Sequence, residues 1–343
     1  MCDAEEVLLS LGREGVLDSL SVGEVKRRVM ARLHPSSLED EAPTFLSRFK
    51  RFMASRSKPR TREIYASTLS RLEAFCPGLA SLAFEDIDRD WLVRFDRWLV
   101  PFAPSRNARN IHLRNIRAVF NDAIGDEVTA AYPFRRFKIK PQPTPKRSLS
   151  VEELRAFFAH PVEPHQRQYL DMFKLVFFLM GINVVDLVHL KSIVAGRVEY
   201  YRAKTARFYS VKVEPEALEI IERYRGSGWL LDVLDRYVDY RAYAMRLNRN
   251  LQEIGSSSYE VRVVAGKRRR VKVYHGLHPK LTTYWARHSW ATIAASLDVP
   301  KETIAAALGH GGGSVTDIYI DFDQRKVDEA NRRVLDWVLY NKR

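Results

Sequence analysis

The chain has 343 residues, enough for two ordinary domains, and its 46% of hydrophobic and 29% of charged residues are typical of a globular protein with buried cores. Lys and Arg outnumber Asp and Glu by 56 to 42, so the formal net charge is +14. This excess favours a polyanionic partner, nucleic acid before an anionic membrane, although a basic protein with no such partner would have the same composition.

Features that the sequence lacks exclude several classes of protein. The longest apolar run, residues 175–185, is about half of the ~20 residues that a membrane-spanning helix needs. Residues 1–6 are acidic, so no signal peptide is predicted. The two cysteines, Cys2 and Cys76, form no CxxC or Cys/His cluster, which excludes a disulfide framework or zinc finger and favours a reducing cytoplasm. No Walker loop, GxGxxG or HExxH motif occurs, so we expect no nucleotide cofactor and no metal.

The N-terminal half is predicted to be helical, with a domain over residues 43–137. Apolar residues recur at helical spacing over residues 45–53 and 64–75, and Asp88 is placed to cap a helix that begins near Trp91. Residues 1–42 form a separate, weakly amphipathic segment to which we assign no role.

A fourth helix of this domain, at about residues 105–124, has one face without acidic side chains before Asp122. At 100° per residue this face contains the following polar and basic residues: Arg106, Asn110, Arg114, Arg117 and Asn121. A solvated face would usually mix in acids, so we expect contact with DNA, with plain solvation as the alternative.

A proline-rich segment separates the two halves. Residues 138–147, KIKPQPTPKR, hold three prolines and four cations. Alternating prolines prevent a helix and favour an extended strand. We therefore predict an interdomain linker at 138–147, followed by a second domain over residues 148–343.

The second domain is predicted to be mainly α-helical with a small antiparallel β-sheet. Ser150 and Glu153 form a capping box, and a buried helix is expected from about Tyr169 to Met180. Residues 198–202 and 208–213 read as a hairpin with Lys204 in its turn. A second hairpin is expected over residues 259–274, turning at Gly266-Lys267 and followed by helices over 286–308 and 327–339. The proposed DNA contacts of this second hairpin are the consecutive cations Lys267, Arg268, Arg269 and Arg270.

Four pieces of this domain carry chemically active side chains in a definite order. They are Lys204 in the hairpin turn, Arg287 in YWARHSW, His310 in Leu-Gly-His, and Tyr319 nine residues later. In this order they resemble the catalytic box of the tyrosine recombinases, also called phage integrases. The stretch LTTYWARHSWATIAASLDVPKETIAAALGHGGGSVTDIYIDF resembles the branch carried by conjugative transposons. The resemblance covers roughly residues 43–340 and implies a helical core-binding domain followed by a catalytic domain.

The residue types suit cleavage of a phosphodiester. The hydroxyl of Tyr319 can attack the phosphorus and keep the bond energy in a phosphotyrosine link, so resealing needs no ATP. The guanidinium of Arg287 would stabilise charge on the non-bridging oxygens, to which His310 can donate a hydrogen bond. Gly311–Gly313 would let the segment with Tyr319 swing onto the phosphate. The resemblance implies that Lys204 is the general acid that protonates the leaving 5′ oxygen.

Each of these residues also has a purely structural interpretation. A tyrosine after an apolar helix is more often core or surface, a histidine suits the end of a helix, and a lysine in a turn is commonly just exposed. Asp186, in GINVVDL, matches an acidic position of the family and is expected to orient a neighbour, whereas His288 is expected to be a structural partner. The complete ordered set outweighs these single-residue interpretations.

The sequence departs from the family pattern at two positions. Asn183 stands where the family has its first arginine, and Tyr284 stands where it has a second histidine. A tyrosine hydroxyl can still bond a phosphate oxygen, whereas loss of the arginine leaves the site one positive charge short. Arg202 is favoured as its replacement because it shares the face of Lys204 in the hairpin. The alternative is that both Arg202 and Arg207 are surface residues.

The sequence therefore predicts a site-specific DNA recombinase. The resemblance implies a homotetramer on double-stranded DNA, strand exchange through a four-way junction and a role in moving a mobile element. The apolar stripe of the helix at 327–339 would dock in a neighbouring subunit, as in the family, or pack on its own domain. A rival interpretation, favoured by Asn183, is a recombinase fold that has lost cleavage and only holds DNA architecture. An RNA-binding protein would explain the charge but not the ordered motifs.

Overall fold

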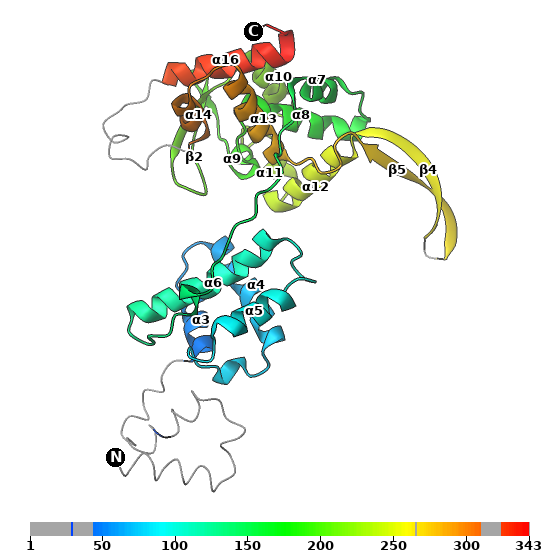
Figure 1. Cartoon of the computed structure of the whole chain (residues 1–343). Coiled ribbons are helices and arrows are strands. Elements are labelled where there is room, and N and C mark those ends of the chain that lie inside the picture. Colours follow the sequence, from blue (N-terminus) through cyan, green and yellow to red (C-terminus); the bar gives the residue numbers. More distant parts are fainter. Residues whose placement is uncertain (1–28, 30–43, 265, 310–323, 343) are drawn as a thin grey trace. The chain divides into compact units, whose positions relative to one another are not determined.

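The chain divides into two units, with the boundary between Thr144 and Pro145, inside the proline-rich segment. Figure 1 presents the computed structural model, which describes residue 29 and residues 44–264, 266–309 and 324–342. His310, Gly311–Gly313 and Tyr319 lie outside the described residues, as does nearly all of the segment 1–42.

The first unit is built from four helices around an aromatic core. They are α3 (Phe45–Ala54), α4 (Pro59–Phe75), α5 (Arg89–Trp98) and α6 (Arg106–Gly125), with the short 3-10 turns Leu79–Ser81 and Pro133–Arg135 between and after them. Asp88 begins α5 as predicted, since its carboxylate accepts a hydrogen bond from the backbone N–H of Trp91 at 2.6 Å. Phe45, Phe84 and Phe120 meet in the core at ring-centroid distances of 5.1–5.9 Å.

The proline-rich segment is tied to α6 by side-chain amides. Asn107 exchanges two hydrogen bonds with the backbone of Gln142, at 2.7 and 2.9 Å. Asn110 donates to the carbonyl of Lys140 at 3.0 Å and is only 2% exposed. The expectation that Asn110 contacts DNA is therefore wrong, because the segment after α6 covers it and takes its hydrogen bond.

The second unit is mostly helical, with nine described helices and two small antiparallel sheets. The helices are α7 (Val151–Ala159), α8 (Pro164–Phe178), α9 (Val184–Val188), α10 (Pro215–Arg223), α11 (Val233–Arg236), α12 (Tyr240–Glu253), α13 (Thr283–Ser296), α14 (Lys301–Leu308) and α16 (Gln324–Tyr340). One sheet has the order β1 (Ile193–Val194), β2 (Arg197–Tyr201) and β3 (Phe208–Lys212), and the other is the hairpin of β4 (Gly255–Val264) and β5 (Lys267–Gly276). The predicted fold class, mainly α with a small antiparallel sheet, is confirmed.

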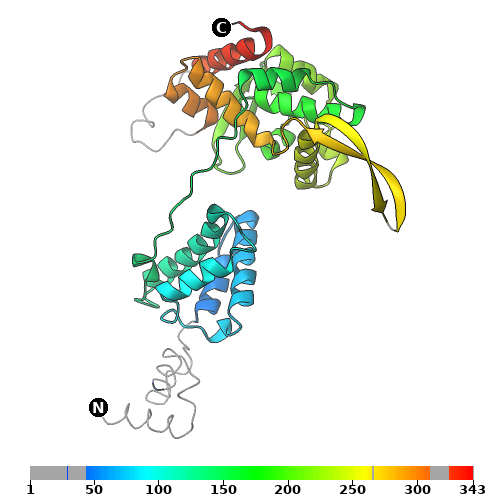
Figure 2. The ribbon, with the colours of Figure 1, turned by 45° about the vertical axis from the view of Figure 1, so that its right-hand side comes forward.

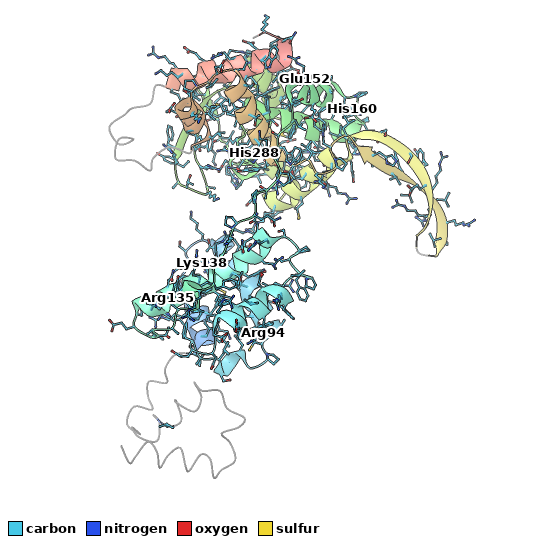
Figure 3. The ribbon with its side chains drawn as sticks, in the orientation of Figure 1. Arg94, Arg135, Lys138, Glu152, His160 and His288 are labelled. Carbon is cyan, nitrogen blue, oxygen red and sulfur yellow. The ribbon has the colours of Figure 1, made fainter. Side chains whose placement is uncertain are left out.

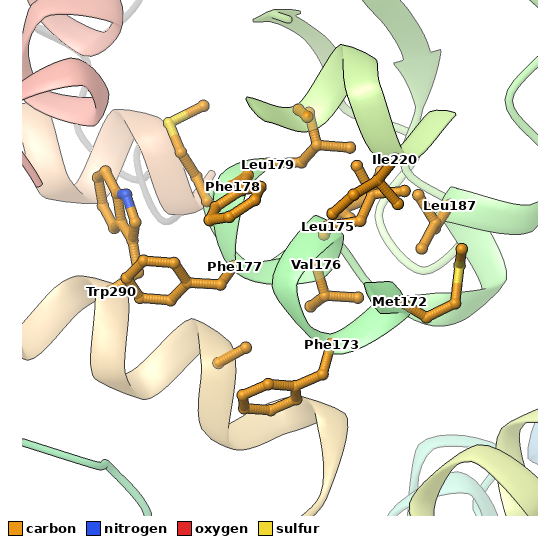
Figure 4. Packing of buried hydrophobic residues seen from close by; sticks show 14 of the residues in the cluster. Met172, Phe173, Leu175, Val176, Phe177, Phe178, Leu179, Leu187, Ile220 and Trp290 are labelled. Atoms are coloured by element: carbon orange, nitrogen blue, oxygen red, sulfur yellow. The ribbon is translucent and has the colours of Figure 1, made fainter. Parts of the chain in front are cut away.

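The core of this unit surrounds α8, which packs against α10, α12 and α13. Figure 4 shows Phe177 of α8 beside Trp290 of α13, and both side chains are fully buried. The indole N–H of Trp290 donates to the Asn331 side chain at 2.9 Å, and the Asn331 amide donates to the carbonyl of Phe178 at 3.0 Å. These two buried hydrogen bonds join α8, α13 and α16, and each of the two N–H donors has an acceptor.

The last helix, α16, packs on its own domain. Its apolar stripe is buried in the core of the second unit, through Val327, Ala330, Val334, Leu335 and Val338. Arg155 of α7 donates to the carbonyls of Trp337 and Val338 at the end of the helix. Of the two predicted alternatives for this stripe, the structure has packing within the same chain.

Several details of the second unit differ from the sequence analysis, including α9, α10, α11 and the break between α13 and α14, none of which was predicted. Helix α12 was not predicted, although Tyr243, Leu247 and Leu251 recur at helical spacing and are fully buried. In the β4–β5 hairpin Val264 pairs with Lys267, so Lys267, which was expected in the turn, belongs to β5. Gly266 has φ +75°, which only glycine adopts without strain.

Candidate active site

Arg287 is a buried cation at the centre of the candidate site. It lies in the first turns of α13 and is 6% exposed. Its Nη1 donates to the carbonyl of Gly181 at 3.2 Å, and its Nη2 donates to the carbonyl of Leu308. A Cβ on Gly181 would lie 2.3 Å from the Cβ of Arg287, so the glycine is required for this close approach.

A second guanidinium, that of Arg202, lies near Arg287. Burial lowers the pKa of Arg287, and the positive charge of Arg202 lowers that pKa further. With its amide oxygen turned toward Arg202, Asn183 accepts hydrogen bonds from Nε and Nη2, both at 3.2 Å. The structure therefore places Arg202 against Asn183, the position where the family pattern has its first arginine.

Within the described part of the chain, the groups that accept hydrogen bonds from these two guanidiniums are uncharged. They are the carbonyls of Gly181 and Leu308, the amide of Asn183 and, at 3.4 Å, the hydroxyl of Tyr209. Two like charges held together, with uncharged groups as their direct hydrogen-bond acceptors, favour the binding of an anion.

Asp186 anchors the turn that carries Lys204. This buried carboxylate, in α9, accepts a hydrogen bond from the backbone N–H of Ala203 at 2.9 Å. The turn closes through the N–H of Arg202 and the carbonyl of Arg207 at 2.8 Å, and Lys204 is exposed at its tip. Asp186 thus orients the turn, which agrees with the expectation that it orients a neighbour.

Tyr209 and Gly309 fix the point where the chain enters residues 310–323. Gly309 ends α14 at φ +62°, and the Tyr209 hydroxyl donates to the carbonyl of Leu308 at 2.9 Å. Beyond that segment, the Gln324 side chain donates to the carbonyl of Ser210 at 3.0 Å. Leu308 and Gln324, which lie on either side of residues 310–323, therefore contact adjacent residues of β3.

Tyr284 and His288 lie together on the exposed side of α13. Their rings meet edge to face at 4.7 Å between centroids, and Tyr284 is 46% exposed. Burial lowers the pKa of His288, and the charges of Arg147 and Arg287 lower it further. His288 is labelled in Figure 3.

The predicted DNA-contacting cations are on the surface. Arg106 and Arg114 of α6 are exposed and Arg117 is half-buried, whereas the run 267–270 on β5 is exposed throughout. A further set of exposed cations, which the sequence analysis missed, lies on α12: Arg241, Arg246 and Arg249. The signal for them was the spacing of the buried residues on the opposite face of α12.

The described residues contain no group of three or more His, Cys, Asp or Glu side chains that could hold a metal ion. Within the same residues, no helix combines the length and the apolar character needed to cross a membrane.

The fold is similar to that of lambda integrase and of the Tn1549 transposon integrase. Residues 43–139 match the family model of the phage integrase SAM-like domain. No curated protein sequence matches the chain.

Solved structures cover most of the chain at low sequence identity. A lambda integrase dimer bound to a COC′ core site has a TM-score of 0.59 at 16% identity, over 81% of this chain and 94% of that one. The Tn1549 transposon integrase in complex with circular intermediate DNA has a TM-score of 0.57 at 15% identity, over 84% of this chain and 99% of that one. A lambda integrase tetramer bound to a Holliday junction has a TM-score of 0.57 at 15% identity, over 81% and 76%. The predicted resemblance to these integrases is confirmed at the level of the fold.

Proposed function

We propose that the chain is a site-specific DNA recombinase that cleaves and rejoins DNA through a covalent 3′-phosphotyrosine at Tyr319, for integration or excision of a mobile element. The observation that carries this proposal is the pair of guanidiniums of Arg202 and Arg287 in a domain with the integrase fold. In this proposal residues 43–137 are the core-binding domain, 138–147 the linker and 148–343 the catalytic domain.

The guanidinium pair suits the phosphate at which strands are exchanged. The charge of one arginine opposes ionisation of the other, and a phosphodiester between them would relieve this repulsion. In the transition state, charge on the non-bridging oxygens increases, and two forked donors stabilise it more than one. Arg202 therefore supplies the charge that Asn183 lacks, while Asn183 holds it in position.

The remaining roles follow from the order of the motifs and from the turn geometry. Tyr319 attacks the phosphorus, and the bond to the 5′ oxygen breaks as the phosphotyrosine bond forms. Lys204 donates a proton to that leaving oxygen, on a turn held by Asp186. His310, which follows Gly309 directly, donates to a non-bridging oxygen. The phosphotyrosine keeps the bond energy, so the step requires no ATP.

The partners proposed are double-stranded DNA and three further copies of the chain, in the cytoplasm. The net charge of +14 fits a DNA partner, and the lambda integrase of the same fold is a tetramer on a Holliday junction. Arg106, Arg114 and Arg117 are the proposed contacts of the core-binding domain with phosphate groups.

Covalent trapping tests the proposal. Nicked duplexes that carry candidate attachment sites are incubated with the protein in excess EDTA and without ATP, and adducts are resolved on denaturing gels. Tyr319→Phe should abolish the adduct and leave DNA binding within a few-fold, whereas the matched variant Tyr132→Phe, in the first unit, should keep both. An adduct formed by Tyr319→Phe would refute Tyr319 as the nucleophile and direct attention to Tyr284 or Tyr340.

A second function, favoured by Asn183, is that of a recombinase-fold protein that binds DNA as an architectural factor without cleaving it. Specific DNA binding with no adduct in any condition would establish this function in place of the first. Tighter binding to RNA than to DNA in competition would contradict both.

A further inference from the structure

The β4–β5 hairpin is a long ribbon that projects from the second unit. In both views, Figure 1 and Figure 2, the ribbon extends beyond α12 and α13. Its strands pair in unbroken register from Gly255↔Gly276 to Val264↔Lys267, which at ~3.4 Å per residue gives a length of about 30 Å. A two-stranded ribbon of this kind is only marginally stable alone in water, so we expect it to work against a partner.

The register divides the ribbon into two different faces. Directly opposed residues share a face, so Val261↔Arg270 and Val263↔Arg268 belong to one face, which we call the valine face. On the valine face, β4 contributes a row of apolar side chains, and β5 contributes a row of cations beside it. Val261 is 68% exposed and Val263 70%, which is unusual for paired valines.

The base of the ribbon is fixed to the domain through the same face. Lys272 forms an ion pair with Glu163, the residue that caps α8, and the Tyr274 hydroxyl donates to Glu163 at 3.1 Å. Farther out, the guanidinium of Arg270 lies over the ring of Tyr259, 4.2 Å from its centroid. The valine face is therefore held in a set direction.

Charge and shape select DNA as the occupant of this face. The strand β5, KRRRVKVYHG, holds five cations and no acid, which a polyanion complements. The major groove of B-DNA is about 12 Å wide and admits a two-stranded β-ribbon. The apolar groups on its floor are the C5-methyl groups of thymines, which match the valine row, and phosphates line its edges.

We propose that the valine face enters the major groove and that Val261 and Val263 read thymine methyl groups, while Arg268 and Arg270 hold phosphates. The ribbon is then a specificity-determining element of the recombinase, and this inference rests on the proposed function. It goes beyond phosphate contact by the run 267–270, because it assigns sequence preference to two uncharged residues.

The experiment uses the full chain and a random-sequence duplex library, from which bound duplexes are recovered and sequenced. Val261→Ser/Val263→Ser removes both methyls of each exposed valine, so that no methyl is left to contact a thymine methyl. The double variant should lose preference at adjacent thymine positions, with a loss of about fourfold in affinity for each methyl contact. Replacing those thymines with uracil should weaken wild-type binding by the same factor and leave the variant unaffected.

A matched control lies on the opposite face of the same ribbon. Val271→Ser should leave the selected sequence unchanged, because Val271 pairs with Glu260 and points away from the valine face. Uracil substitution without effect on the wild type would overturn the inference, and this arm requires no variant to fold. A shift caused by Val271→Ser alone would also overturn it. If the wild type selects no DNA sequence at all, the proposed site-specific function fails as well. If the wild type selects a sequence and forms the covalent adduct, but the ribbon variants select the same sequence, only the proposed role of the ribbon is refuted.

Discussion

Gly309 carries the end of α14 past the hydroxyl of Tyr209, in a place where a side chain would not fit. A Cβ there would lie 1.6 Å from the Tyr209 oxygen, and the backbone has φ +62°. The carbonyl just before it accepts hydrogen bonds from both Arg287 and Tyr209. One small residue therefore sets the position of the buried cation and of the chain that continues to His310.

We expect Gly309→Ala to destabilise the second unit and to reduce adduct formation more than backbone strain alone would. Gly196→Ala is the matched control, because Gly196 has φ +74° but no atom within 4 Å of an added Cβ. A left-handed alanine costs about 1–3 kcal/mol at either position, and the clash at Gly309 adds to that cost. Urea denaturation and the covalent assay measure both variants. Equal losses would mean that Tyr209 moves aside freely.

Arg202 provides a second test at the residue scale. If it replaces the missing arginine, Arg202→Ala should slow single-turnover cleavage by roughly 10²–10³, the usual effect of removing one transition-state donor. Arg207→Ala, on the other side of the same turn, should change the rate by no more than a few-fold. Adding Asn183→Arg to the Arg202→Ala variant should restore cleavage, because the substitution places the lost positive charge at residue 183, the residue that Arg202 contacts.

The outcome that contradicts this assignment is equally clear. If neither alanine variant slows cleavage and Asn183→Arg alone speeds it strongly, the site is weakened and has no substitute arginine.

At the scale of elements, α16 is held by a charged cluster as well as by its apolar stripe. Arg332 bridges Glu216 of α10 at 3.0 Å, and the Tyr340 hydroxyl donates to the same carboxylate at 2.6 Å. Burial of Glu216 opposes its ionisation, but the hydrogen bonds from Arg332 and Tyr340 outweigh burial and lower its pKa from 4.5 to about 2.

This shift predicts acid sensitivity of α16 docking. Because the pKa of Glu216 is lower in the folded state, its contribution to stability is present above about pH 4.5 and is lost as the pH falls toward 2. Discounted for solvent screening, the contribution is roughly 1–2 kcal/mol. Glu216→Gln should remove that part of the pH dependence in urea melts, while Glu219→Gln, a more exposed partner of Arg223, should not. A parent and Glu216→Gln with parallel pH profiles would contradict this account.

Local signals predicted most elements, and long-range contacts account for what was missed. The capping box of Ser150 and Glu153 and the hairpin around Lys204 depend on residues that are close in the sequence, and both predictions are confirmed. Asn110 was misplaced because its partner, the carbonyl of Lys140, comes from a segment beyond the helix. The second hairpin was predicted over residues 259–274, whereas its strands extend from Gly255 to Gly276 and Lys267 lies in β5 and not in the turn.

The candidate site could be predicted in part only. The order of motifs identified Arg287 and Lys204, and the face of the hairpin favoured Arg202. The contact of Arg202 with Asn183 depends on how α9 and the β2–β3 turn meet, which no local pattern determines. For the same reason, the close approach of Gly181 to Arg287 is visible only in the structure.

On the scale of the whole molecule, the chain has an excess of 14 positive charges, and exposed cations lie on both units. The exposed face of α6 supplies Arg106 and Arg114, and β5 supplies the run 267–270. Few of these cations are paired with carboxylates in the described structure, whereas Arg332 and Arg223 are. Structural arginines and DNA-contacting arginines can therefore be separated by experiment.

We expect binding of duplex DNA to weaken steeply with salt, because each neutralised phosphate releases a condensed counterion. Arg106→Gln and Arg114→Gln should each lower the slope of log affinity against log salt concentration by about 0.9, and so should Arg268→Gln on β5. Arg89→Gln is the control, since Arg89 is exposed but paired with Asp90 at 3.0 Å and should leave the slope unchanged. Titrations at several salt concentrations measure the slopes. If neutralising α6 and β5 together leaves the slope as it is, these faces are solvated surfaces, and DNA must bind elsewhere on the chain, with the exposed cations of α12 as the next candidates.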